Sequence, residues 1–191
     1  MGRNRGLRVR ILPQLDAPAF EFRPFERLRI RLWDHGWLRI DAYNVDGPVP
    51  RRGRPDALLE GLLRHRIYRD SYAVPESWTY ETEGTHGPFF VARLKPSDFH
   101  AISFDELEAR LDAHLEDDPE FDDPPDDAQW AEVRGFLAGL PQGEVECYRL
   151  AVDLESEKHR HSYAFLHLRF AEYLVLHRGL STLHLLVFGH D

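Results

Sequence analysis

The feature that most restricts the fold is the C-terminal part of the sequence, residues 144–189, which holds the densest apolar run. Residues 145–154, 163–177 and 183–188 alternate between two faces, and the last two segments become apolar on both faces. Polar residues at 155–161 and the pair Arg178-Gly179 separate the segments. This pattern predicts a three-stranded antiparallel meander that forms the core, because strands apolar on both faces are normally covered on both sides.

The middle segment, residues 163–177, exceeds the usual length of one strand, so we expect a bulge near Ala171 and Glu172. The alternation also predicts which side chains of the meander are buried. They are Leu166, Leu168, Phe170, Leu183, Leu185 and Val187.

A hairpin is predicted in the N-terminal half, because residues 28–32 and 38–42 alternate around the turn Asp34-His35-Gly36. Alternation also predicts a short strand at residues 7–11 and a second hairpin from residues 78–82 and 90–94 around the turn at 84–87. Helices are predicted at residues 55–66, 103–115 and 127–139. Ser103 and Glu106 form a capping box for the second helix, and Asp127 is suited to cap the third.

These elements predict an α+β protein with a mostly antiparallel sheet of about seven or eight strands, covered by two or three helices. Residues 1–191 are interpreted as a single domain, because no linker is long enough to divide them. The single cysteine, the absence of a charged-then-apolar leader and the absence of a run of about 20 apolar residues predict a soluble, cytoplasmic protein.

Charge is distributed unevenly along the sequence. Residues 1–95 hold 17 Lys and Arg against 12 Asp and Glu, whereas residues 96–191 hold 7 against 21. Such asymmetry indicates either an interaction surface or two halves that pack against each other.

Four arginines lie on one face of the first predicted hairpin, edged with tryptophan and tyrosine: Arg27, Arg29, Arg31 and Arg39. We expect this arginine ladder to be at least partly paired with carboxylates of the acidic half. Arginine beside aromatic rings also suits nucleic-acid binding, but the net charge of −9 argues against it.

Motifs of the common cofactor and hydrolase classes are absent, so we expect no cofactor and no established catalytic site. The His159-x-His161 pair is a weak metal candidate because Lys158 and Arg160 flank it. His167 and His184 are expected to be structural rather than a catalytic pair, and Cys147 is expected to be an inert packed thiol.

An acidic run with prolines occupies residues 116–127. It lacks the glycine and the final glutamate of a calcium-binding EF-hand loop, and its charges suit attraction of a basic protein partner. A solubilising connection between two helices is the alternative. The residues predicted to meet the partner are Asp117, Asp118, Phe121, Asp122, Asp123, Asp126, Asp127 and Trp130.

The end of the sequence carries a family resemblance, on Phe170, Glu172, Tyr173 and Leu174 and then on residues 183–187 and Asp191. This pattern resembles the closing hairpin of immunity proteins from bacterial polymorphic toxin systems. The resemblance implies an acidic cytoplasmic inhibitor that binds one toxin domain without enzymatic activity, and it carries over no site residue. The alternative is a small hydrolase or nucleotide-processing enzyme that uses histidine and carboxylate residues, which would require an open pocket where these groups converge.

Overall fold

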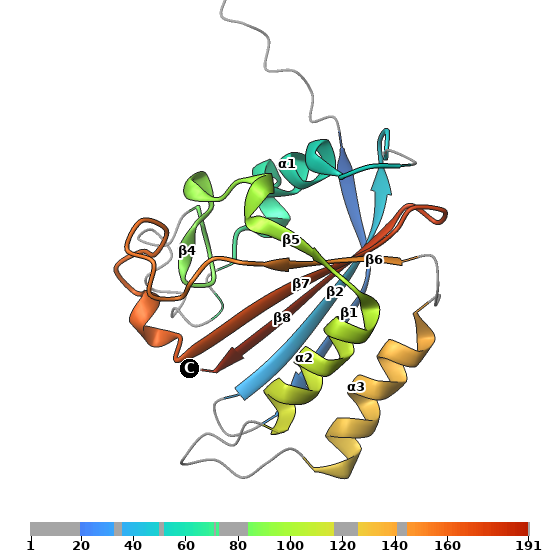
Figure 1. Ribbon diagram of the computed structural model, residues 1–191, viewed down its shortest axis with the longest axis vertical. Coiled ribbons are helices and arrows are strands. Elements are labelled where there is room, and N and C mark those ends of the chain that lie inside the picture. Colours follow the sequence, from blue (N-terminus) through green and yellow to red (C-terminus); the bar gives the residue numbers. More distant parts are fainter. Residues whose placement is uncertain are drawn as a thin grey trace, which may run out of the picture.

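The computed structural model describes residues 20–32, 36–49, 52–70, 72, 84–116, 126–140 and 145–190 (Figure 1). Its centre is a six-stranded antiparallel sheet in the order β1-β2-β8-β7-β6-β5. The strands are β1 (Glu21–Arg31), β2 (Gly36–Asp46), β5 (Phe99–Ile102), β6 (Val145–Leu150), β7 (Arg169–His177) and β8 (Thr182–His190). The helices are α1 (Asp56–Arg64), α2 (Phe104–Glu116) and α3 (Asp127–Gly139). The predicted α+β class with a mostly antiparallel sheet is confirmed.

The predicted meander and the predicted first hairpin are both present, and they join through one pair of strands. β6, β7 and β8 are adjacent, and β1 pairs with β2 with Leu28 opposite Ile40. β2 then pairs with β8 from Gly36 opposite His190 to Asn44 opposite Thr182. The N-terminal and C-terminal segments therefore form one continuous sheet.

The long strand predicted over residues 163–177 is wrong in its first part. β7 begins only at Arg169, and residues Ala164–Leu166 form a 3-10 turn. The amides of Ala164, Leu166 and His167 each bond the carbonyl three residues earlier, so they are used locally and not in a strand ladder. No bulge occurs at Ala171 and Glu172, because the β7–β8 register runs without a shift.

The predicted burial fails in the same place. Leu168 is 64% exposed, and Leu166 and Phe170 are only partly buried. Leu183, Leu185 and Val187 are buried as predicted. The irregularity that the pattern predicted for β7 lies instead in the edge strand β1, between Pro24 and Glu26.

The helices follow their predicted apolar positions, with one correction at a cap. Ser103 Oγ accepts a hydrogen bond from the amide of Glu106 at 3.0 Å, as predicted. Asp126 caps α3 in place of Asp127: its Oδ1 accepts from the amides of Ala128 and Gln129 at 2.9 and 2.8 Å. Gln129 Oε1 accepts in return from the Asp126 amide at 2.7 Å. Asp126 takes the role because only the residue three positions before Gln129 completes this reciprocal capping box.

The second hairpin is shorter than predicted. It consists of β3 (Thr85–His86) and β4 (Phe89–Phe90), and Ala92 lies in a 3-10 turn that Leu94 follows. The predicted strand at residues 7–11, the turn at Asp34-His35, and residues 78–82 lie outside the described residues.

The sheet separates two apolar clusters, one on each face. Leu174 and Leu176 pack with the buried leucines of α1, whereas Tyr173 and Val175 pack with residues of α2 and α3. α2 and α3 lie side by side across one face of the sheet, and α1 lies near the opposite end of the fold (Figure 1). In the part of the chain that the structure describes, no helix has the length and hydropathy needed to cross a membrane.

Candidate functional site

The first candidate surface is the acidic helix layer, which we define as α2, α3 and their connection, residues 104–140. It contains thirteen Asp and Glu against two Arg, a net charge of −11, and the rest of the chain is therefore +2 because the whole is −9. Both helices turn leucine and valine side chains toward the sheet. The described acidic residues of the layer are Asp105, Glu106, Glu108, Asp112, Asp126, Asp127 and Glu132, and all of them are exposed or only partly buried.

Three of the residues predicted to meet a partner lie at the start of α3. Asp126 and Asp127 are exposed, and Trp130 is partly buried against the apolar cluster below. The Arg134 guanidinium lies 4.8 Å from the Trp130 ring centroid. Asp126 holds the helix cap, and Asp127 is exposed in the first turn without taking part in the cap. Asp117, Asp118, Phe121, Asp122 and Asp123 lie outside the described residues.

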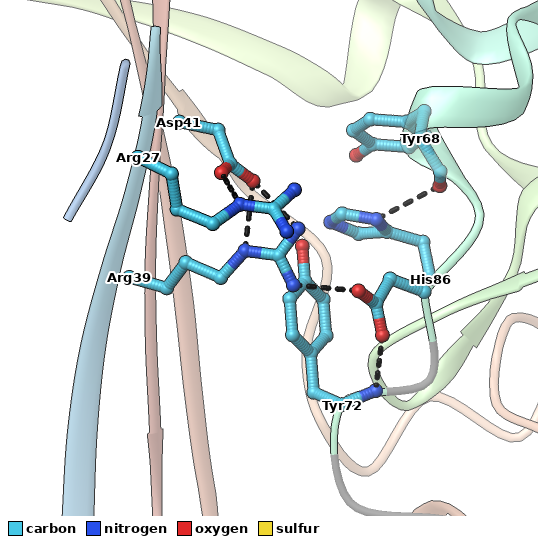
Figure 2. A network of polar contacts seen from close by, with 7 residues as sticks. Arg27, Arg39, Asp41, Tyr68, Tyr72 and His86 are labelled. Carbon is cyan, nitrogen blue, oxygen red and sulfur yellow. Dashed lines mark hydrogen bonds and ion pairs between the residues drawn. The ribbon is translucent and has the colours of Figure 1, made fainter. Parts of the chain in front are cut away.

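Two arginines of the ladder, Arg27 and Arg39, pair with carboxylates of the basic half. Arg27 Nε lies 2.5 Å from Asp41 Oδ1, and Arg39 bonds Asp41 Oδ2 at 2.6 to 2.7 Å. Arg39 Nη1 also bonds Asp70 at 2.6 Å. Figure 2 shows both guanidinium groups converging on Asp41. For Arg27 and Arg39 the prediction was wrong about the partners, because the nearest carboxylates stand on the same hairpin and on the segment after α1.

These pairs weaken the nucleic-acid interpretation for Arg27 and Arg39. Asp41 is 2% exposed, so its charge is buried and compensated by the two arginines. Hydrogen bonds to Asp41 and Asp70 raise the pKa of Arg39 above its usual value, outweighing the opposing effect of burial. Both guanidinium groups therefore already have anionic partners.

Tyr72 extends this network in a strained backbone conformation. Its φ is +60°, which non-glycine residues rarely adopt, and its amide donates to Asp70 Oδ1 at 2.9 Å. The ring stacks on Trp37 at a centroid distance of 5.1 Å, and the Arg39 guanidinium lies 5.1 Å from its centroid. Among the described residues nothing hydrogen-bonds the buried Tyr72 hydroxyl, and burial raises its pKa well above the usual range.

A polar cluster that the sequence did not predict lies inside the α1 face of the sheet. Glu172 on β7 accepts from the Tyr68 hydroxyl at 2.8 and 2.9 Å, and its Oε2 lies 2.6 Å from His86 Nε2. The Tyr68 and His86 rings stack at 3.8 Å with an interplanar angle of 6°. All three side chains are essentially buried. Burial, followed by the charge and hydrogen bond of Glu172, raises the pKa of Tyr68 well above its usual value.

His86 contacts an oxygen atom with each of its two ring nitrogens. Its Nδ1 lies 2.9 Å from the Tyr68 carbonyl oxygen, which can only accept, so Nδ1 carries a proton (Figure 2). The Nε2 contact falls outside hydrogen-bond geometry, so we describe it as a close charge pair and not as a linear hydrogen bond.

The other histidines do not form the two sites that the sequence suggested, a metal pair of His159 and His161 and a catalytic pair of His167 and His184. His161 Nε2 lies 2.8 Å from the Gly87 carbonyl, and His159 Nδ1 lies 2.8 Å from Ser156 Oγ. His184 stands on β8 between Ala42 and Val175, whereas His167 precedes β7. Within the described ranges no three His, Cys, Asp or Glu side chains are grouped to hold a metal ion.

Cys147 is buried, and burial raises the pKa of its thiol to about 11. The thiol is therefore protonated at neutral pH, which matches the expected inert packing role.

Comparison with known proteins adds no assignment to these sites. No protein-family model matches the sequence, and no curated protein is significantly similar to it. The roles of the residues therefore rest on charge and geometry alone.

The sequence did not reveal the His86–Glu172–Tyr68 cluster, because Tyr68 and Glu172 are 104 residues apart and no local pattern connects them. The one available signal was Glu172 itself, a carboxylate in a segment that is otherwise apolar on both faces. A buried carboxylate needs partners, but the sequence does not name them.

Proposed function

We propose that this protein binds a basic partner protein through the acidic helix layer and acts as an inhibitor of the immunity-protein type. The observation that carries the proposal is the concentration of charge: residues 104–140 carry −11, while all other residues together carry +2. A concentration of negative charge accelerates the encounter with an oppositely charged surface and suppresses wrong partners.

The packing of α2 and α3 against the sheet supports a rigid binding surface on these two helices. Buried Leu107, Leu111, Val133 and Leu137 hold both helices on the sheet, so little conformational entropy remains to be lost on binding. Partly buried Trp130 supplies an aromatic side chain beside the acidic start of α3, and such residues often dominate the free energy of binding.

The enzyme alternative would use either a buried pair or the open hollow that His114 and Asp153 line between β6 and β7. Its histidine and carboxylate meet in the His86–Glu172 pair, whose side chains are both 0% exposed. A substrate would need an opening to reach them.

The binding proposal is tested with two variants of equal charge change. The first neutralises exposed acids of the layer: Asp105→Asn, Asp127→Asn and Glu132→Gln. The control neutralises exposed acids elsewhere: Glu26→Gln, Asp46→Asn and Glu157→Gln. Both are used with the wild type to capture partners from the source cells, and the association rate of the recovered protein is measured at low and high salt.

We expect the layer variant to associate about tenfold more slowly at low salt, with a flatter salt dependence, and the control to change little. Equal rates for both variants would contradict the proposal. The inhibitor role is tested separately by expressing the recovered partner alone and together with this protein. Growth arrest that coexpression relieves is the expected result, and a harmless partner would overturn the immunity role.

A further inference from the structure

A cleft opens where two neighbouring strands of the sheet separate. The β6–β7 ladder ends at the pair of Arg149 and Tyr173, and beyond it residues 150–153 leave β7. The amide of Ala151 instead donates to the Asp98 carbonyl at 2.8 Å. The hollow between the separated segments, which we call the β6–β7 cleft, has a volume of about 380 Å³. This volume lies within the usual range of small-molecule sites.

Basic and hydrogen-bonding side chains converge on the cleft from three elements. Arg149 comes from β6, Arg110 and His114 from α2, and Tyr173 from β7. His114 Nε2 lies 2.8 Å from the Tyr173 hydroxyl. Burial raises the pKa of Tyr173 to about 12, and the positive charges of Arg110 and Arg149 oppose that rise, which indicates that both guanidinium groups lie near this hydroxyl.

Arg149 is partly buried and has no carboxylate within ion-pair distance among the described residues. It differs in this respect from Arg39 and Arg178, which are also partly buried and hold carboxylates at 2.6 Å. A shielded guanidinium without a counterion is costly unless an anion can reach it.

The carboxylates near the cleft do not occupy all the guanidinium donors of Arg110 and Arg149, so these donors can still bind an anion. Glu106 Oε1 engages the Nε and Nη2 of Arg110, and this guanidinium also hydrogen-bonds the Tyr173 hydroxyl, which leaves some of its five N–H donors for another acceptor. Asp153 stands at the exposed rim, where its Oδ1 accepts from the Glu155 amide. The fully buried Glu172 side chain lies on the α1 face of the sheet, where it contacts Tyr68 and His86.

We propose that the β6–β7 cleft binds a small organic anion, with a phosphate or carboxylate group held by Arg149 and Arg110. The walls from Leu150, Val152 and Phe170 supply an apolar surface for the body of the ligand. Arginine suits this role because its planar donors match the oxygens of either group. This site is independent of the partner surface on the outside of the helix layer.

Titration calorimetry with three probes tests the site: inorganic phosphate, adenosine monophosphate and benzoate. The first offers the anion alone, and the other two distinguish a phosphate source from a carboxylate source. We expect saturable binding of one ligand per chain for at least one probe. Arg149→Gln should weaken it about ten- to a hundredfold, because a hydrogen-bonded charge pair is lost.

Arg134→Gln is the matched control, since Arg134 lies on the exposed side of α3 over Trp130 and outside the cleft. Arg149→Lys keeps the charge and should weaken binding less than Arg149→Gln. If Arg149→Gln does not fold, Arg110→Gln on the helix surface replaces it.

Amide chemical shifts of residues 149–153 and 170–173 should move when the binding probe is added. No saturable binding of any probe, equal affinity of the Gln variant and the Arg134 control, or shifts confined to other residues would overturn the proposal.

Discussion

The two faces of the sheet are built in different ways. The face under α2 and α3 is covered by two regular helices, and its aliphatic and aromatic cluster is joined by the buried histidines His177 and His184 of the strands. The other face is covered by α1, 3-10 turns and a two-stranded hairpin, and it encloses His86 and Glu172 among its apolar residues. Helices satisfy their own backbone hydrogen bonds, whereas irregular segments need additional polar partners in the interior.

This difference predicts where the molecule tolerates change. On the helix face, stability should depend on volume and on helix caps. On the α1 face, stability should also depend on the pairing of buried charges and on glycine backbone that packs directly against aromatic rings. The four predictions below test this contrast, beginning with the largest expected effect.

Replacing Glu172 with Ala should lower the free energy of unfolding by about 3 to 5 kcal/mol, because His86 and the Tyr68 hydroxyl would be left buried without their partner. Urea denaturation measures the change, with Glu157→Ala at an exposed position as the control. The combined variant Tyr68→Phe, His86→Leu and Glu172→Met should recover much of the loss. A loss below about 1 kcal/mol for Glu172→Ala would show that the cluster is not a buried charge pair.

Two glycines offer opposite outcomes on the two faces. A Cβ at Gly189 in β8 would overlap the Trp37 ring, so Gly189→Ala should cost about 1 to 3 kcal/mol through overpacking. A Cβ at Gly135 in α3 meets nothing within 4 Å, and Gly135→Ala should stabilise the protein by about 0.5 to 1 kcal/mol through helix propensity. Thermal unfolding of both variants measures the sign, and equal signs would refute the contrast.

The cap of α3 distinguishes two adjacent aspartates. Asp126→Ala should cost about 1 kcal/mol because two amides lose their acceptor. Asp127→Ala should cost only a few tenths, since it loses a favourable charge near the helix start. Denaturation midpoints of the two variants measure the difference. The reverse order would mean that the cap lies at Asp127, as the sequence alone suggested.

Acid should weaken the α1 face through His161. Burial lowers the pKa of this histidine below its usual value of about 6.5, so the unfolded chain binds the proton more readily than the folded protein. The contribution of His161 to stability is therefore complete above about pH 6.5 and declines as the pH falls below it.

Unfolding measured from pH 7.5 to 5 should show a shallower decline for His161→Gln than for the wild type, and His184 keeps part of the slope because burial lowers its pKa as well. His100→Gln, at an exposed position, is the control. An unchanged slope in His161→Gln would contradict the role of this group.

The sequence determined most of the helix face and the strand core. Periods of two and of 3.6 placed β2, β8 and the helices, because burial on one side imposes a repeat that a single segment displays. The capping box at Ser103 was readable for the same reason, since its two residues lie within one helical turn. The concentration of acidic residues at 104–140 is likewise a property of the sequence alone.

Only the tertiary structure decided the α1 face, the pairs of the arginine ladder and the β6–β7 cleft. The alternation at residues 163–168 was not a strand, because local hydrogen bonds of a 3-10 turn competed with the ladder. Arg39 pairs with Asp70, and Glu172 contacts Tyr68 and His86. These partners are far apart in the sequence, and no periodic pattern of residues predicts them. Local repeats record which side of a segment is buried, whereas the partner of a buried charge depends on how distant segments meet in space.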